Sequence, residues 1–133
     1  MAAVERHANP DADQALVARL RALLGDAVST DDTELSVAAH DIFFDGPRPA
    51  CVVRPSDRGQ VATLLKCAAE LGFAVHPRGG GMSYTRGYLA QRAGAVLLDL
   101  GGLNRIVAIN GDDLYVTVEP GVTWKQLDDA LQP

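Results

Sequence analysis

The sequence has few aromatic residues, only two cysteines and no long hydrophobic run, and each of the last two shortages excludes a class of protein. The longest apolar stretch, residues 95–98, is far too short to cross a bilayer, so we expect no membrane span. Cys51 and Cys67 are too few for a disulfide framework and fit a reducing compartment. The polar start of the chain has no hydrophobic signal core, so we expect a cytoplasmic protein.

Basic residues are also scarce, because 12 Lys and Arg stand against 17 Asp and Glu and leave a formal charge of −5. A nucleic-acid-binding surface usually shows a basic excess, so we expect no nucleic-acid partner. A small anionic cofactor needs only a local positive potential and remains compatible with this balance. Hydrophobic residues make up 47% of the 133 residues, which excludes wholesale disorder and supports a compact fold.

The first third of the chain predicts a helix followed by a connection. Residues 13–24 carry an apolar stripe at helical spacing, and Gly25 follows where a helix commonly ends. Residues 29–49 are less regular and rich in turn signals. We therefore interpret residues 1–49 as an N-terminal helix and connecting segment, and residues 50–133 as the main unit.

The main unit opens with a strand, a helix and a second strand. Residues 50–53 form a short apolar run that Pro55 stops, and Ser56 can cap a helix over residues 57–71. Residues 73–75 begin the second strand. This order predicts a βαβ crossover with parallel strands, the second lying beside the first.

Three further apolar runs predict strands over residues 95–100, 105–109 and 114–118. Asn110-Gly111, between the last two, is a strong hairpin signal. Thr123 then begins a last helix with the form of a capping box.

The most informative stretch follows the second predicted strand and reads Pro77-Arg78-Gly79-Gly80-Gly81-Met82-Ser83-Tyr84-Thr85. Three consecutive glycines leave backbone N–H groups uncovered by any Cβ and can take positive φ, which lets several amides surround one anion. Arg78 adds positive potential, and Ser83 and Thr85 offer hydroxyl donors. A flexible turn is the plain alternative, because the loop has neither a Walker lysine nor the G-x-G-x-x-G spacing.

A second motif reads Val118-Glu119-Pro120-Gly121-Val122-Thr123-Trp124. Its Pro-Gly pair turns the chain from a strand into a capped helix, whose first turn presents free N–H groups. Taken alone, this motif favours an ordinary strand-to-helix turn.

Together, the two motifs resemble the FAD-binding domain of the vanillyl-alcohol oxidase/p-cresol methylhydroxylase (PCMH-type) flavoprotein family, the N-terminal region of FAD-linked oxidases. The resemblance covers residues 50–131 and includes Val53-x-Pro55, Leu98-Asp99-Leu100 and Leu103-Asn104-Arg105-Ile106. It implies an α+β fold, the first subdomain of a PCMH-type FAD-binding domain, with the βαβ crossover in a small mixed sheet.

In that family the glycine loop wraps the FAD diphosphate and the Pro-Gly turn lines the same cofactor. The resemblance therefore implies FAD contacts by residues 77–85 and by Pro120, Gly121 and Val122. It implies the FAD-binding part of an oxidoreductase that oxidises a small alcohol, hydroxy acid or phenol. The alternatives are the flavin subunit of a multi-chain dehydrogenase and a non-catalytic interaction module that kept the fold.

The sequence departs from the family in three ways. Met82 stands where many relatives have a histidine, which in some is bonded to the flavin, so we expect non-covalent FAD. Arg86 replaces a small residue and either offers another cation to the cofactor or points to solvent. Relatives continue into a second FAD subdomain and a substrate-binding cap, so we expect this chain to be incomplete and inactive alone, with its catalytic residues unassigned.

Several polar and aromatic residues leave two interpretations open. His40 with Asp41 or Asp45 suggests a metal or acid–base site, but a hydrogen-bonded surface cluster is favoured, so we expect no metal. Tyr84 and Tyr88 either stack near the flavin or pack within the loop.

Overall fold

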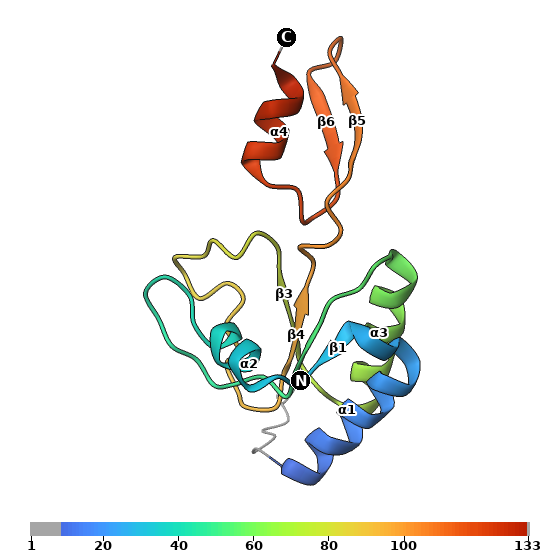
Figure 1. Cartoon of the computed structure of the whole chain (residues 1–133), viewed down its shortest axis with the longest axis vertical. Helices are drawn as coiled ribbons and strands as arrows, with labels where there is room; N and C mark the ends of the chain where they lie inside the picture. Colours follow the sequence, from blue (N-terminus) through green and yellow to red (C-terminus); the bar gives the residue numbers. More distant parts are fainter. Residues whose placement is uncertain (1–8, 133) are drawn as a thin grey trace, which may run out of the picture.

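The computed structural model describes residues 9–132, which form a body and a protruding extension (Figure 1). Residues 1–8, part of the predicted signal-free start, and residue 133 lie outside the described residues. The body contains α1 (Pro10–Leu24), β1 (Val28–Ser29), α2 (Asp32–Ala38), β2 (Cys51–Val53), α3 (Arg58–Leu71), β3 (Val75–Arg78) and β4 (Val96–Asp99). The extension contains β5 (Ile106–Asn110), β6 (Tyr115–Val118) and α4 (Trp124–Leu131).

A four-stranded mixed sheet in the order β1-β2-β4-β3 forms the centre of the body. The strands β2, β4 and β3 run parallel, and β1 pairs antiparallel with β2. The α+β fold, the βαβ crossover through α3 and the small mixed sheet are therefore confirmed. The expectation that the second strand lies beside the first is wrong, because β4 lies between β2 and β3.

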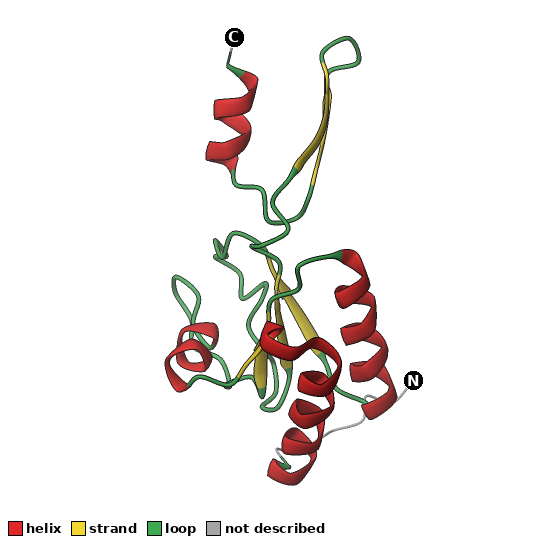
Figure 2. Cartoon of the chain, turned by 45° about the vertical axis from the view of Figure 1, so that its right-hand side comes forward, coloured by secondary structure: helices red, strands yellow, loops and turns green. Residues whose placement is uncertain are grey.

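Two apolar cores on opposite faces of the sheet explain why β4 is central. One core contains Leu16, Leu20, Leu24, Val28, Cys51, Val53, Leu64, Cys67, Val96 and Leu98. The other contains Ala38, Val52, Tyr88, Leu89 and Leu97. Side chains alternate between the faces of a strand, so the buried residues 96–98 supply both cores, which a central strand does best. Figure 2 shows α1 and α3 on one side of the sheet and α2 on the other.

The N-terminal segment contains more structure than its sequence predicts. The helix α1 begins after Asn9, whose side chain accepts from two amides of the first turn, and Gly25 follows it at φ 57°. Residues 29–49, expected to be irregular, contain α2, which begins after Asp31. The Asp31 carboxylate accepts the amide of Glu34 at 3.0 Å. A seven-residue helix is too short for its apolar period to stand out. The boundary at residue 50 stays a prediction.

The N-terminal cap of α3 is Asp57, so the expectation of a Ser56 cap is wrong. The Asp57 carboxylate accepts the amide of Gln60 at 2.9 Å. The Ser56 amide donates to the Gln60 side chain at 2.9 Å, so Ser56 joins the cap through its backbone. Asp57 is the cap because its backbone is extended, at φ −155°, and directs the carboxylate toward the free amides of the first turn.

The second strand begins at Val75 rather than at Phe73. The helix α3 ends at Gly72 in the left-handed region, and the Phe73 amide donates to the carbonyl of Ala68 at 2.8 Å. Phe73 is therefore used to close the helix. As a result, Pro77 and Arg78 belong to the end of β3 rather than to the loop that follows.

The extension matches its sequence closely. The strands β5 and β6 form an antiparallel hairpin, and the Asn110 side chain accepts the amide of Asp113 at 2.9 Å in the turn. The Thr123 and Gln126 side chains form the predicted capping box at the start of α4.

Large apolar side chains of the extension are exposed, with Leu114 at 89% and Trp124 at 87%. Between residues 9 and 132, no helix has the length and apolar character needed to span a membrane.

Candidate functional site

The glycine loop, residues 79–85, begins where β3 ends beside β4, with Arg78 opposite Asp99. Gly81 adopts a φ of 74°, which glycine takes without strain. A Cβ built on Gly80 would meet no atom within 4 Å. The loop therefore curls at Gly81 and leaves open space over Gly80.

The backbone amides in the first part of this loop donate no hydrogen bond, whereas those at its end do. Within residues 9–132, the amides of residues 79–84 donate no hydrogen bond. The Ser83 hydroxyl oxygen accepts the amide of Thr85 at 3.3 Å and that of Gly87 at 2.8 Å. The donors available to a ligand therefore belong to the first half of the loop, and Ser83 shapes the second half.

Two guanidinium groups lie beside the loop. Arg78 is half-buried, and its guanidinium carbon lies 5.0 Å from the ring centre of Tyr88. Its Nη2 would be only 2.7 Å from a Cβ on Gly81. The Arg86 guanidinium stacks 4.2 Å from the Phe44 ring centre, and the residue is exposed to solvent. Neither guanidinium forms a salt bridge in the described part of the chain, but the charge of Arg86 interacts with the nearby Asp41 carboxylate, so it is Arg78 that leaves positive potential at the loop.

The Pro-Gly turn closes against the start of the glycine loop. A Cβ on Gly79 would lie 2.9 Å from the carbonyl oxygen of Pro120, so only glycine allows this approach. A Cβ on Gly121 would collide with the carbonyl oxygens of Leu100 and Leu103. The Gly121 amide donates a hydrogen bond to the Leu103 carbonyl oxygen at 2.8 Å. The structure thus brings together the two motifs that the sequence singled out.

Glu119 and Arg105 hold the turn at the base of the hairpin. The buried Glu119 carboxylate accepts the Arg105 amide at 2.9 Å and two guanidinium nitrogens at 2.6 and 3.0 Å. These bonds to Arg105 hold the pKa of Glu119 below its ordinary value. The pair therefore stays charged at neutral pH and fixes the chain immediately before Pro120.

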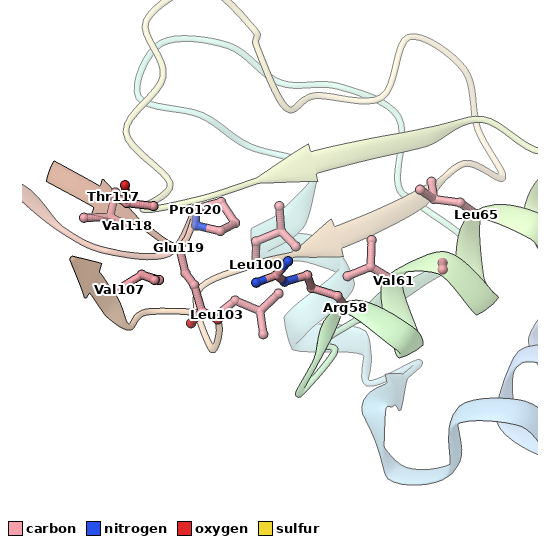
Figure 3. Close-up of a pocket in the computed structure, with 11 residues that line it drawn as sticks. Arg58, Val61, Leu65, Leu100, Leu103, Val107, Thr117, Val118, Glu119 and Pro120 are labelled. Atoms are coloured by element: carbon pink, nitrogen blue, oxygen red, sulfur yellow. The ribbon is translucent and has the colours of Figure 1, made fainter. Parts of the chain in front are cut away.

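An apolar groove of about 500 Å³ separates α3 from the hairpin (Figure 3). It is lined by Arg58, Val61, Ala62, Leu65, Leu100, Leu103, Val107, Thr117, Val118, Glu119 and Pro120. The sequence did not reveal this groove, because its walls come from separate segments. Its lining is mostly apolar, so it does not suit a diphosphate.

The segment 40–45 contacts the glycine loop, a relation that sequence analysis missed. The Asp41 carboxylate accepts the amides of Phe43 and Phe44 at 2.9 and 2.7 Å and that of Arg86 at 3.0 Å. The Phe43 ring lies 5.7 Å from that of Tyr84. The Asp-x-Phe-Phe sequence is a local sign of an Asp-capped turn. The third amide that Asp41 accepts belongs to Arg86, 45 residues away and directly after the glycine loop, so no local pattern predicts it.

His40 belongs to this segment and forms a hydrogen-bonded cluster. Its Nδ1 lies 2.6 Å from the carbonyl oxygen of Ser36, and its Nε2 lies 3.5 Å from Asp45. Among residues 9–132, no group of three or more potential ligand side chains could hold a metal.

Met82 and Tyr84 of the glycine loop are exposed, and Tyr88, which follows the loop, is not. Met82 is 74% exposed and Tyr84 is 56% exposed, whereas Tyr88 is buried and packs within the second core. Packing therefore accounts for Tyr88, and the exposed loop side chains leave the backbone accessible.

These features fit the diphosphate of a dinucleotide cofactor. The free amides of residues 79–84, the open space over Gly80 and the Arg78 guanidinium supply donors, room and positive potential. Glycines and free amides after a parallel strand are a common anion-binding arrangement. A glycine loop of this kind in an α+β fold is typical of a nucleotide-binding domain.

Residues 49–133 match the family model described as FAD binding domain, and the chain belongs to this family of PCMH-type FAD-linked oxidoreductase domains. It is 33% identical over 84% of its length to a 1'-carboxy-chondrochloren decarboxylase from Chondromyces crocatus. It is 31% identical over 90% of its length to a mitochondrial D-lactate dehydrogenase [cytochrome] from Kluyveromyces lactis. It is 30% identical over 87% of its length to the flavoprotein subunit of 4-cresol dehydrogenase [hydroxylating] from Pseudomonas putida.

A solved structure of p-cresol methylhydroxylase with substrate bound resembles this fold with a TM-score of 0.80 at 27% identity. The match covers 93% of this chain and 25% of that one. The chain spans only 21–23% of the length of the three curated relatives. FAD is the cofactor of this family.

Proposed function

We propose that this chain is the FAD-binding part of a flavin-dependent oxidoreductase, with the FAD diphosphate between the glycine loop and the Pro120–Val122 turn. The observation that supports this most is the approach of Gly79 to the Pro120 carbonyl oxygen, which brings the two motifs side by side. The family membership supplies the identity of the cofactor.

Each part of the site has a defined task in this proposal. The amides of residues 79–84 donate to the diphosphate oxygens, and Arg78 balances part of the charge. The Ser83 oxygen already accepts two amides, but its own proton remains available for a further bond. Pro77 lies within β3, one residue before its end, and Thr85 adds a hydroxyl donor at the far end of the loop.

The reaction class follows from the relatives rather than from a catalytic group in this chain. When bound, the flavin would serve as the acceptor of the hydride or electrons removed from a substrate C–H bond. The names of two relatives indicate a hydroxy acid and a phenol as substrates, and we propose a small alcohol, hydroxy acid or phenol here. Another relative is named a decarboxylase, and this different reaction name supports the proposal that the FAD-binding part alone does not set the substrate.

We also propose that FAD is held without a covalent bond to the loop. Met82 occupies the tip, and its thioether is no nucleophile toward the flavin under ordinary conditions. Acid precipitation of the flavin-loaded protein should release all the flavin into the supernatant, and yellow colour retained on a Met82-containing peptide would contradict this.

The decisive experiment adds one methyl group over the loop. Gly80→Ala should fold normally, because its Cβ meets no atom within 4 Å, but the methyl should obstruct the diphosphate. Gly111→Ala is the matched control, because its Cβ also meets nothing and lies in the hairpin turn. Titration with FAD and with ADP, followed by amide NMR signals of residues 79–84, should show a roughly tenfold weaker Kd for Gly80→Ala only.

Two results would overturn the proposal. One is a wild-type chain whose loop amides do not respond to millimolar FAD or ADP. The other is an equal Kd for Gly80→Ala and wild type. Melting temperatures of both variants show whether folding is intact.

A second arrangement has the chain acting as the flavin subunit of a multi-chain dehydrogenase, as the flavoprotein-subunit name of one relative suggests. Co-purification of a redox partner with tagged protein from its source would favour it. For the compartment we propose the cytoplasm, because the two cysteines are both free and form no disulfide, as is usual in a reducing compartment. Cell fractionation tests this location.

A further inference from the structure

Tyr88 joins the glycine loop to the rest of the body. Its side chain is 6% exposed and packs in the second core with Val52 and Leu97. Its hydroxyl lies 3.1 Å from the carbonyl oxygen of Gly81 and 3.1 Å from that of His40. A hydroxyl has one proton, so these two carbonyls share it, and Tyr88 holds the loop and the segment 40–45 together.

The bond to Gly81 determines the direction of the next amide. A trans peptide is planar, and its C=O and N–H point in opposite directions. When the Gly81 carbonyl points at the buried Tyr88 hydroxyl, the Met82 N–H points away from Tyr88. That amide donates no hydrogen bond within residues 9–132.

The Tyr88 ring also contacts the nearest cation. The Arg78 guanidinium carbon lies 5.0 Å from the ring centre, within the range of a cation–π contact. Hence one buried side chain touches both the charge and the backbone that face an incoming diphosphate.

We propose that Tyr88 is the positioning residue of the FAD diphosphate site: its hydroxyl turns the Gly81–Met82 peptide so that the Met82 amide faces the ligand, and its ring places Arg78. This inference rests on the proposed function, since an aimed amide matters only if the loop binds the diphosphate. Tyr88 itself does not touch the cofactor.

The segment 40–45 stabilises this arrangement. The His40 carbonyl shares the Tyr88 proton, and Asp41 accepts the amide of Arg86, two residues before Tyr88 in the chain. Arg86 adopts a φ of 59°, a left-handed conformation that this bond helps to hold. Tyr88 therefore enters the core from a backbone that is restrained on its N-terminal side.

Tyr88→Phe tests the inference, because it removes the hydroxyl and keeps the ring, its packing and its contact with Arg78. Tyr115→Phe on the exposed β6 strand is the matched control, because the Tyr115 hydroxyl has no hydrogen bond within the described residues. Two measurements are made on each chain: the order of the Met82 amide by NMR relaxation without ligand, and its response to ADP and FAD.

In Tyr88→Phe we expect a more mobile Met82 amide, a smaller shift of its signal on adding ADP, and a Kd raised roughly five- to tenfold. If Tyr88 had only a structural role, Tyr88→Phe would lower the melting temperature without a specific change in the mobility or ADP response of the Met82 amide. Tyr115→Phe should match the wild type in every measurement.

The outcomes separate the inference from the proposed function. If the wild-type loop responds to ADP and Tyr88→Phe responds identically, the inference is overturned and the proposed function stands. If the wild-type loop does not respond to either ligand, both fall. Should Tyr88→Phe not fold, the wild-type chain still decides, because a rigid Met82 amide whose signal shifts on adding ADP supports the inference. A mobile or unresponsive Met82 amide, in a loop whose other amides respond, contradicts it.

Discussion

At the residue scale, Asp41 shows how one carboxylate connects distant parts of the chain. Burial alone would raise the pKa of Asp41, but the amides of Phe43, Phe44 and Arg86 outweigh it and hold the pKa below its ordinary value. A group whose pKa is lowered by folding makes its full contribution to stability at pH values above its unfolded pKa, which is about 3.9 for aspartate. That stability is lost as the pH falls through the folded pKa.

Asp41→Asn should therefore lower the melting temperature by a few degrees at pH 7, because an amide NH₂ cannot accept the Arg86 N–H. The gap to the wild type should narrow below about pH 4, as the wild-type carboxylate also becomes protonated. Melting curves over a pH series measure this.

Asp112→Asn serves as the control for this series, because the exposed Asp112 side chain makes no hydrogen bond among the described residues. A gap between Asp41→Asn and the wild type that stays constant from neutral to acidic pH would show that the Asp41 charge does not matter.

At the element scale, the start of α3 depends on one side chain. Asp57 accepts the Gln60 amide, whereas Ser56 contributes only its backbone N–H. The helix carries Leu64 and Cys67 into the first core and covers one face of the sheet. A weakened cap therefore acts on the body as a whole.

Asp57→Ala should cost about 1 kcal/mol of unfolding free energy, the usual effect of losing an N-terminal cap. Ser56→Ala should change it by less than about 0.5 kcal/mol, because an exposed side chain without a tertiary contact contributes little. Urea unfolding of the two variants measures both values. A larger loss for Ser56→Ala than for Asp57→Ala would mean that the serine side chain caps the helix.

At the scale of the whole molecule, the extension exposes apolar surface that the body does not cover. The exposed large side chains there are Val107, Ile109, Leu114, Tyr115, Val118, Trp124 and Leu131. A gathering of such residues is typical of a surface that another structure covers. Since the relatives are several times longer than this chain, such a cover fits the family.

The chain by itself should therefore self-associate with rising concentration and bind a hydrophobic dye. Trp124 is the only tryptophan, and its emission should be that of a solvent-exposed indole in dilute solution. A Leu114→Gln, Trp124→Gln double variant should bind less dye and stay monomeric to higher concentration in sedimentation experiments.

Leu23→Gln is the control for the double variant, because Leu23 is a half-exposed leucine on α1, outside the extension. Equal association of the double variant and wild type would exclude the extension as the contact surface.

Much of the candidate site could be predicted, because its signals are local. The glycine run, the Pro-Gly turn and the capping box each lie within a few residues and have meaning without the rest of the fold. The α2 helix was missed because seven residues carry too little periodicity. The role of Tyr88 was left open, because a tyrosine in a loop gives no sign of which carbonyls it reaches.

The amino-acid sequence alone therefore determined the order of most helices and strands, the hairpin, and the membership of the FAD-binding family, since these depend on short-range patterns. Only the tertiary structure decided that β4 lies between β2 and β3, that Gly79 meets Pro120, and that Tyr88 holds both Gly81 and His40. The physical reason is packing: which distant segments touch depends on how two apolar cores are filled at once, and no local pattern contains that information.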